Sequence, residues 1–318
     1  MNHDLRAELD LVAEASIAAL RAPSILNSQP WRWRLNGDQA ELWADRSRQL
    51  TGLDPDGRLL LLSCGAALNH AVVTLRAAGY SAAVGRRPDP AHPDLVARFG
   101  RGECVAADAL AEAIERRHTD RRPFGDERPG EAVLEELREV AGRHGVHLQI
   151  IRDEQVTAFA AAVAHAGEIE RDDARFRTDL RTWTNRAHGD GVTGQSVVAT
   201  TRRTVAPRDF ALKAGLAAGT GTDRGTVYAL FVTDGDEPRD WLAAGEALSE
   251  VWLTLTARGL AASPISEVVE VPGVRLALRR LLGGVGNPAV AMRIGVPVQE
   301  TRPPATPRRS PSATLTAG

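Results

Sequence analysis

Residues 23–31 have the composition of a ligand-binding turn. They run Pro-Ser-Ile-Leu-Asn-Ser-Gln-Pro-Trp, so that Ser24, Asn27 and Gln29 lie between two prolines. Proline restricts the backbone, and a side-chain amide offers both donors and an acceptor. A stiff turn that presents two amides suits a flat heterocycle with alternating donors and acceptors. The structural alternative is a helix C-cap, followed by a core strand that begins at Trp31.

Residues 116–122 have the composition of a phosphate site. In the order Arg-Arg-His-Thr-Asp-Arg-Arg, Arg117 and Arg121 are four residues apart and Thr119 lies between them. The planar guanidinium group matches the oxygens of a phosphate dianion, and the hydroxyl adds a donor. Asp120 either orients an arginine or repels the phosphate. A solvated basic turn is the alternative interpretation.

Several other kinds of site are not predicted. The glycines of 215–225 and 283–286 lack the Gly-x-Gly-x-x-Gly spacing of a dinucleotide fold, and the single lysine, Lys213, is not in a Walker loop. Cys64 and Cys104 are far apart, and the eight histidines show no ligand spacing, so we expect no disulfide and no metal site. A net charge of −2 gives no general attraction to nucleic acid or an anionic membrane.

The two polar stretches together resemble the nitroreductase family of FMN proteins. The family motif Pro-Ser-x-x-Asn-x-Gln-Pro-Trp is matched in full by residues 23–31, and residues 116–121 are similar to its phosphate motif Arg-Arg-Ser-x-Arg. The resemblance implies that the FMN-binding residues include Pro23, Ser24, Asn27, Gln29, Arg117, His118, Thr119 and Arg121. In this family the flavin N5 does the chemistry, so no catalytic side chain is named.

Two weaker matches lie later in the chain. Residues 259–266 resemble the family motif Gly-Leu-x-x-x-Pro-Ile-Glu, with Ser266 where the family has Glu. The resemblance implies that the backbone after Pro264 and Ile265 approaches the flavin N5 at Ser266, with Glu267 beside it. A late basic pair helps to hold the phosphate in the family, which implies that role for Arg308 and Arg309.

An internal repeat indicates that the chain is duplicated. With a shift of 180 residues (245 − 65), eight identities align, from Gly65 with Gly245 to Ala82 with Ala262; chance similarity of two Ala/Leu-rich helices is the alternative. The phosphate motif also follows the Pro-Ser motif, the reverse of the order in an ordinary nitroreductase. The arrangement resembles the double-length Acg-type branch of actinobacteria, in which a dimer is fused into one chain.

The resemblance implies an α+β, three-layer α/β/α fold of two diverged half-units, with a mostly antiparallel central sheet flanked by helices. We expect a first half at 1–105, which makes the contacts of a partner subunit, and a second half at 106–300 with the phosphate site. Because no phosphate motif precedes Pro23, we expect one FMN. A C-terminal extension at 301–318 is expected to be extended or disordered unless it docks.

The periodicity predicts the main elements. We expect helices at 4–21, 59–78, 108–117, 131–144, 154–170 and 241–258, and strands at 31–35, 40–44, 81–85, 95–99, 146–152, 226–233 and 290–294. Asn36-Gly37 is a strong hairpin signal. Residues 172–222 are Gly-rich and poorly periodic, and we expect them to form a lid.

Two functions stay open. The first is an oxidoreductase that transfers hydride from NAD(P)H through FMN to a nitroaromatic, quinone or similar small acceptor. The second is a protein that sequesters FMN under a closed lid without NAD(P)H turnover. The sequence shows no secretory signal and no long apolar run, so we expect a cytoplasmic protein, a monomer that mimics a dimer.

Overall fold

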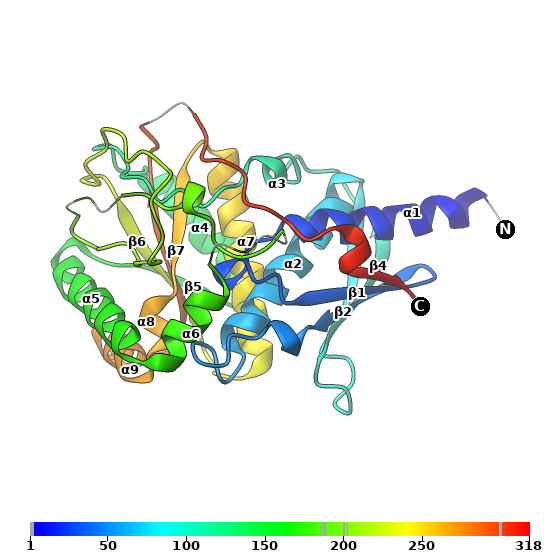
Figure 1. The fold of residues 1–318 in the computed structure, drawn as a ribbon. Helices are drawn as coiled ribbons and strands as arrows, with labels where there is room; N and C mark the ends of the chain where they lie inside the picture. Colours follow the sequence, from blue (N-terminus) through cyan, green and yellow to red (C-terminus); the bar gives the residue numbers. More distant parts are fainter. Residues whose placement is uncertain (1–2, 185, 187–188, 200, 202, 299–300) are drawn as a thin grey trace.

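The computed structural model describes residues 3–298 and 301–318, except 185, 187, 188, 200 and 202, with the backbone alone for 3–10. Its helices and strands form two sheets with a helical layer between them (Figure 1). One sheet has the strand order β3-β4-β2-β1-β9, and its bounds are β1 (Trp31–Asn36), β2 (Gln39–Ala44), β3 (Tyr80–Arg86), β4 (Leu95–Cys104) and β9 (Leu315–Ala317). The other has the order β5-β6-β8-β7, with β5 (His147–Ile150), β6 (Val227–Thr233), β7 (Ala261–Ile265) and β8 (Asn287–Gly295).

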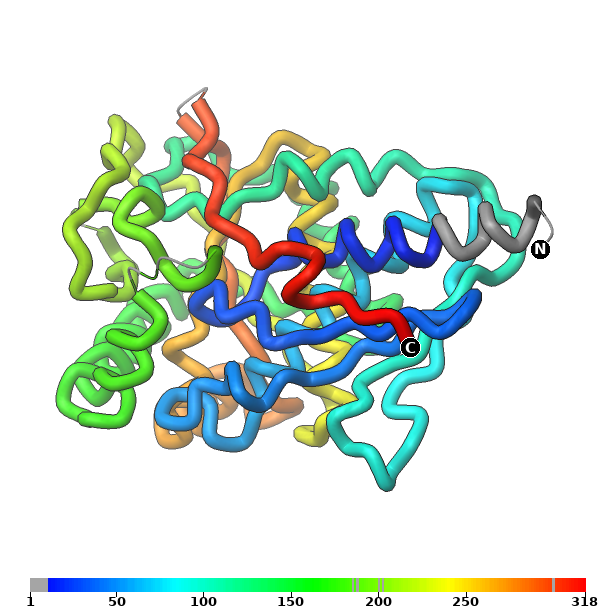
Figure 2. The backbone as a smooth tube through the Cα atoms, turned by 45° about the vertical axis from the view of Figure 1, so that its right-hand side comes forward, coloured from blue at the N-terminus to red at the C-terminus, as the bar shows by residue number. Residues whose placement is uncertain are grey.

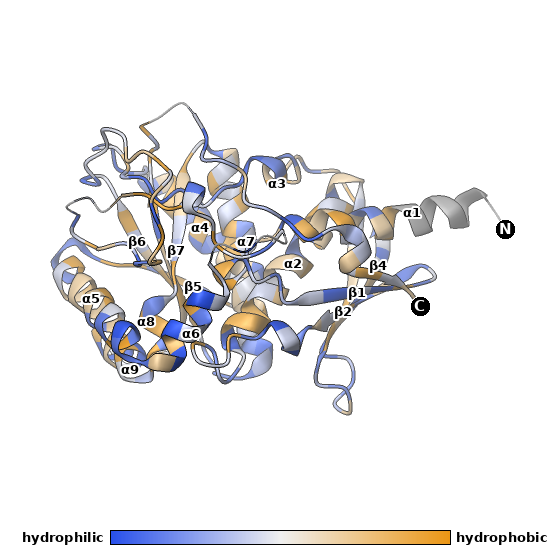
Figure 3. Cartoon of the chain, viewed as in Figure 1, coloured by the Kyte–Doolittle hydropathy of each residue, from blue (hydrophilic) through white to orange (hydrophobic). Residues whose placement is uncertain are grey.

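The helices divide between the two sheets. They are α1 (His3–Ala18), α2 (Arg58–Ala77), α3 (Glu112–Arg116), α4 (Glu131–Gly142), α5 (Val156–Asp172), α6 (Ala174–Thr182), α7 (Pro238–Ala257), α8 (Glu267–Glu270) and α9 (Pro272–Leu281). Helices α1 and α2 pack on the first sheet, whereas α7 packs on the second, whose strand β8 also contacts α8 and α9. Every residue of β6 is buried, so both faces of this strand are covered. Hydrophilic residues gather on parts of α6 and α9, at the edge of the molecule (Figure 3).

The two repeat helices, α2 and α7, pack against each other through matching glycines. A Cβ atom at Gly65 would lie 2.1 Å from the carbonyl oxygen of Leu242, and one at Gly245 would lie 1.9 Å from that of Leu62. Leu62 and Leu242 are also 180 residues apart (242 − 62). Each helix has 20 residues and is followed by a left-handed glycine, Gly79 or Gly259. The contact is therefore self-complementary, as in a two-fold symmetric dimer.

The sheets repeat the same connectivity. The order β3-β4-β2-β1 in the first sheet corresponds to β7-β8-β6-β5 in the second, and all of these neighbours pair antiparallel. Only β1 and β9 pair in parallel among the strands that the structure describes. The predicted α+β fold of two diverged half-units with mostly antiparallel strands is confirmed, but these strands form two sheets, one against α2 and one against α7, where we expected a single central sheet. The division into 1–105 and 106–300 stays a proposal.

The apolar helix α2 has the length and composition of a membrane span. However, 83% of its apolar stretch is buried inside the protein. Its partners are α7 and the first sheet, so α2 is accounted for as a core helix (Figure 2).

One expectation for the secondary structure was wrong. The helix predicted at 108–117 spans only 112–116, because Arg117 already has extended angles. Within the segment 172–222, which we expected to form a lid, helix α6 follows the cap residue Asp173, whose side chain accepts the backbone N–H of Arg175, and Phe176 and Leu180 of α6 pack on the core. The tail docks, as the expectation allowed, because residues 315–317 pair with β1.

Candidate functional site

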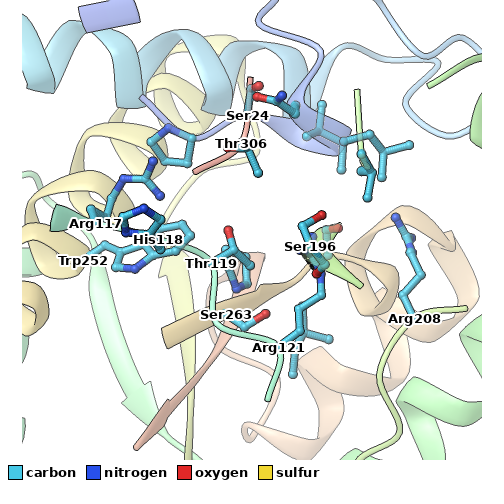
Figure 4. Close-up of a pocket in the computed structure, with 18 of the residues that line it drawn as sticks. Ser24, Arg117, His118, Thr119, Arg121, Ser196, Arg208, Trp252, Ser263 and Thr306 are labelled. Atoms are coloured by element: carbon cyan, nitrogen blue, oxygen red, sulfur yellow. Dashed lines mark hydrogen bonds between the residues drawn. The ribbon is translucent and has the colours of Figure 1, made fainter. Parts of the chain in front are cut away.

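A cavity of about 190 Å³ lies where segments of both halves meet (Figure 4). A single buried water needs on the order of 10–15 Å³ of such space, so the cavity has room for a ligand of many atoms. Its lining comes from the turn at 23–27, the segment 117–121, helix α7, the end of β7, the segment 191–210 and the tail at 304–308. Twelve of the fourteen residues proposed from the sequence line it: Pro23, Ser24, Asn27, Arg117, His118, Thr119, Arg121, Pro264, Ile265, Ser266, Glu267 and Arg308.

The turn after α1 is strained. Leu26, Asn27 and Gln29 have φ values of 44°, 54° and 48°, although none is glycine. Such angles cost free energy and persist where the surroundings enforce them. The Ser24 hydroxyl oxygen accepts the backbone N–H of Gln29 at 2.9 Å and closes the turn. This backbone presents Pro23, Ser24 and Asn27 to the cavity.

The amides of this turn bind protein segments. The Asn27 amide nitrogen donates to the carbonyls of Gly191 (3.1 Å) and Pro307 (3.0 Å). Gln29 is fully buried; it donates to the Gly189 carbonyl at 3.0 Å and accepts the backbone N–H of Arg309 at 2.8 Å. Gln29 therefore lies outside the cavity lining, and its hydrogen bonds dock two segments, around 189–192 and 306–309, that we call the covering segments.

Residues 117–121 form an extended segment beside β7. Thr119 bridges Ala262 in parallel. Alternate side chains of extended backbone share one side, and in Figure 4 Arg117, Thr119 and Arg121 surround the cavity. Asp120 turns away and pairs with Arg122 at 2.7 Å, so it accompanies an arginine outside the cavity. His118 also lines the cavity, with Nδ1 2.7 Å from the carbonyl oxygen of Arg116.

Arg117 and Arg308 are two neighbouring cations without an anion. Burial, and then the charge of Arg308, lower the pKa of Arg117 to about 9. Burial also lowers the pKa of Arg308 to about 10. Neither pairs with a carboxylate in the described part of the chain, and the Nε atom of each is buried without a hydrogen-bond partner. Because isolated buried charges are costly, this end of the cavity suits a phosphate.

Arg117 is held by neutral groups. Its guanidinium lies 4.5 Å from the ring centroid of Trp252 and donates to the carbonyl of Arg21 at 3.0 Å. Arg308 donates to the Asn27 side-chain oxygen at 3.2 Å and to the Thr306 hydroxyl at 2.6 Å. These contacts position both guanidinium groups without neutralising them.

Arg121 belongs to a different part of the cavity. It stacks on Phe210 with 4.8 Å between guanidinium and ring centroid, and donates to the carbonyl of Ser196 at 3.1 Å. Burial lowers the pKa of Arg121 to about 10, although Glu267 acts against this. Its charged neighbours include Glu267 and Arg208, whereas Arg117 neighbours Arg308. The two arginines therefore define two separate cationic regions.

The sequence motifs missed an acidic cluster at the end of β7. Arg208 and Glu267 both line the cavity, and Arg208 Nε lies 3.5 Å from Glu267. Arg208 also pairs with Glu170 at 2.9 Å and with Glu270. The motifs indicated Glu267 but none of the other three members, since the four residues come from α5, α8 and the loop before β6.

Arg309 is the second predicted residue outside the cavity lining. It donates to the carbonyls of Gln29 (3.0 Å), Trp31 (3.1 Å) and Ala313 (2.8 Å). These bonds fasten the tail to the first sheet. The basic pair therefore divides, because consecutive side chains of an extended tail point in different directions: Arg308 faces the cavity, and Arg309 faces β1.

Comparison with known proteins gives full-length relatives. No family model matches the chain. A putative NAD(P)H nitroreductase of Mycobacterium tuberculosis is 38% identical over 312 residues, which cover 92% of this chain and 87% of the relative. A second one from that organism, named acg, is 34% identical over 316 residues, which cover 96% and 95%.

The similar solved structures are more distant in sequence. The FMN-dependent nitroreductase NfnB from Mycobacterium smegmatis, solved in complex with NADPH, is 17% identical, with a TM-score of 0.41. The match covers 64% of this chain and 97% of that one. A nitroreductase with bound FMN from Bacteroides fragilis is 13% identical, with a TM-score of 0.38, and the match covers 62% and 92%.

The duplicated fold and the full-length relatives together define the class. This chain belongs to the NAD(P)H nitroreductase family. Within that family it is a member of the double-length, Acg-type branch.

Proposed function

We propose that the chain binds one FMN in the cavity and transfers hydride from NAD(P)H to a small acceptor, such as a nitroaromatic compound or a quinone. The observation that supports it most is the pair Arg117 and Arg308, two cations without a carboxylate partner at one end of the cavity; Arg117 is buried, Arg308 is half-buried, and the Nε atom of each is buried without a hydrogen-bond partner. The names of the relatives and the FMN and NADPH in the neighbouring structures agree with the proposal.

Each predicted residue has a proposed task. Arg117 and Arg308 hold the phosphate, and the Thr119 hydroxyl and His118 complete that end. Arg121 places a positive charge at the other region, where the ring system would lie. The turn at Pro23, Ser24 and Asn27 supplies a wall from the first half, and the backbone at 264–267 supplies the opposite wall. FMN, when bound, accepts a hydride and passes it on.

Reduction of the purified protein tests this function. We expect one FMN per chain, counted by absorbance and phosphate quantitation, because the phosphate end has one set of arginines. Under anaerobic conditions NADPH should bleach the flavin, and a quinone or nitroaromatic acceptor should restore the colour. A protein that binds no flavin would contradict the proposal.

Storage of FMN is the second candidate, and the anchoring of the segment between α6 and β6 favours it. Val192, Val205 and Phe210 of this segment line the cavity, so the segment is a candidate lid. It is held by the ion pair of Asp190 with Arg48 and by buried Arg208. A lid that stays closed would keep a nicotinamide away from the flavin.

Shortening residues 185–195 separates the two functions. A lid that only blocks access should release NADPH oxidation when it is trimmed, whereas a lid that completes an active site should lower it. Equal reduction rates and equal FMN release in the intact and trimmed proteins would show that the segment is not a lid.

The setting of the protein is also part of the proposal. The self-complementary contact of α2 and α7 supports a monomer that mimics a dimer. The net charge of −2 suits small-molecule partners better than nucleic acid or a membrane. Free Cys64 and Cys104 suit a reducing cytoplasm.

A further inference from the structure

A second, smaller cavity adjoins the main one. It has a volume of about 40 Å³ and shares Leu59 and Leu62 with the main cavity. Asp54 and Glu270 line the small cavity, whereas Glu267 and Arg208 line the large one. The acidic cluster around Arg208 thus has members on both cavities.

The cluster has more carboxyl groups than its one arginine can neutralise. Glu170, Glu267 and Glu270 all pair with Arg208, and the four side chains are at most 13% exposed. Burial raises the pKa of Glu170 to about 9, because the charges of Glu270 and Glu267 and a hydrogen bond with Glu270 offset the attraction of Arg208. Two carboxyl groups that share a site cannot both ionise easily. Glu170, which shares its partner Arg208 with Glu270, therefore keeps a proton at neutral pH.

Asp54 extends the cluster toward the small cavity. It is 3% exposed and accepts the backbone N–H of Leu60 at 2.8 Å. Burial raises the pKa of Asp54 to about 6, and the nearby charge of Glu270 contributes. Glu270 Oε1 is buried without a hydrogen-bond partner. The other charged groups of the small cavity are Asp56, Arg58 and Arg275.

Hydride transfer to the proposed acceptors consumes a proton. A hydride carries two electrons and one proton, whereas the reduction of a quinone to a hydroquinone takes up two electrons and two protons. One proton must therefore enter the main cavity from elsewhere in each turnover, and a positioned acid supplies it faster than bulk water.

We propose that the Glu170–Glu270 pair, with Asp54 and Glu267, supplies this proton. The inference rests on the proposed oxidoreductase function. In the step, an O–H bond of the carboxyl pair breaks, a new O–H bond forms on the reduced acceptor, and the hydride from the reduced nicotinamide balances the electrons. Water then reprotonates the pair at Glu170, the most exposed of its carboxyl groups. These residues act through one another, and Glu267 lines the cavity where the acceptor would bind.

Glutamine variants test the relay. Glu170→Gln and Glu270→Gln keep the shape of the side chain and remove its acid. We expect each to slow acceptor reduction about tenfold or more, to change its pH profile, and to leave FMN affinity within about twofold. A small carboxylic acid in the buffer should restore part of the rate of Glu270→Gln. Glu168→Gln, an exposed residue of the same helix, is the matched control.

A second measurement needs no turnover. Infrared spectra of the wild-type protein at neutral pH should show the carbonyl band of a protonated carboxylic acid, which disappears as the pH rises through about 9. Glu170→Gln should lack the band, and Glu168→Gln should keep it. An absent band would contradict a protonated Glu170.

The outcomes distinguish the two proposals. NADPH turnover with the band present, but with unchanged rates and pH profiles in both glutamine variants, would overturn the relay alone. A protein that binds FMN but is not reduced by NADPH would overturn the oxidoreductase function and, with it, the relay, even if the band is present.

Discussion

The two halves share their framework but differ in what surrounds it. Helices α2 and α7 have the same length, and the four corresponding strands have the same order in each sheet. In the first half the two-residue turn Gly37–Asp38 joins β1 to β2, whereas in the second a long insertion with α5, α6 and the candidate lid joins β5 to β6. The helix and strands of each half bury apolar residues against one another, so both halves keep them. The connections lie on the surface, so they are free to differ.

The difference is clearest at the positions that correspond to the cavity. With the 180-residue shift, Ser266 corresponds to Arg86 and Trp252 to Val72. Ser266 and Trp252 line the cavity, whereas Arg86 forms two 2.7 Å hydrogen bonds with buried Glu246 of α7. The first half thus uses the position of Arg86 for an ion pair with α7 of the second half. At these two positions the second half lines the cavity, whereas the first half does not.

The largest effect is expected at the symmetric contact. Gly65→Ala or Gly245→Ala should lower the free energy of unfolding by about 3 kcal/mol or prevent folding, because the added methyl group overlaps a backbone carbonyl. Denaturant unfolding measures the change. The control Gly167→Ala, also within a helix but with open space around it, should stabilise by up to about 1 kcal/mol. Equal stability of all three variants would show that the helices do not cross at the glycines.

The next largest effect is expected at Glu250, a buried carboxylate of α7 that pairs with Arg76 of α2. Burial opposes ionisation of Glu250, yet His144 and Arg76 hold its pKa at about 2. Because this lies below the ordinary value of 4.5, the carboxylate stabilises the fold above that pH, and the contribution is lost as the pH falls toward 2. Glu250→Gln should cost about 3 kcal/mol at neutral pH and much less in acid.

A surface pair provides the control for Glu250. Glu136 pairs with exposed Arg258, so Glu136→Gln should cost about 0.5 kcal/mol or less. Thermal unfolding of both variants across the pH range measures the difference. A cost for Glu250→Gln that does not change with pH would contradict the assignment.

Arg117 separates binding from folding. Arg117→Met should weaken FMN binding about 30- to 150-fold, which corresponds to about 2–3 kcal/mol for a lost charge-assisted contact. The same change should raise the melting temperature of the FMN-free protein, because it removes a buried charge without a partner. Fluorescence titration and thermal unfolding measure the two effects.

The late basic pair sharpens this test. Arg308→Met should behave like Arg117→Met, whereas Arg309→Met, outside the cavity lining, should change FMN affinity by only about threefold or less. Equal losses for Arg308 and Arg309 would show that the phosphate does not lie between Arg117 and Arg308.

The smallest effect is expected at Asn27. Asn27→Gly keeps the left-handed backbone and removes the amide that binds the carbonyls of Gly191 and Pro307. We expect about 1 kcal/mol less stability and faster amide exchange at 189–192 and 306–309. Exchange within α5 serves as the internal reference and should not change. Unaltered exchange in both covering segments would contradict their docking on Asn27.

Local pattern determined much of this protein. The periodicity of α2 and α7, the stop at the left-handed glycines Gly79 and Gly259, and the hairpin after Trp31–Leu35 depend on neighbours along the chain, so they could be predicted, although the turn lies at Gly37–Asp38, one residue later than Asn36-Gly37. The 180-residue repeat predicted the duplicated fold, and twelve of the fourteen residues predicted from the motifs line the cavity.

Only the tertiary structure decided which side chains share a partner. In the sequence Gln29 lies beside Asn27 in one motif, and Arg309 lies beside Arg308. In the structure, however, Gln29 and Arg309 hydrogen-bond to each other, whereas Asn27 and Arg308 line the cavity. Arg208, Glu170 and Glu270 come from three separate elements, and no local pattern predicts their contact. The physical reason is that the pKa and the partner of a buried group depend on desolvation and on charges brought close by long-range packing, whereas periodicity records only which face of an element is apolar.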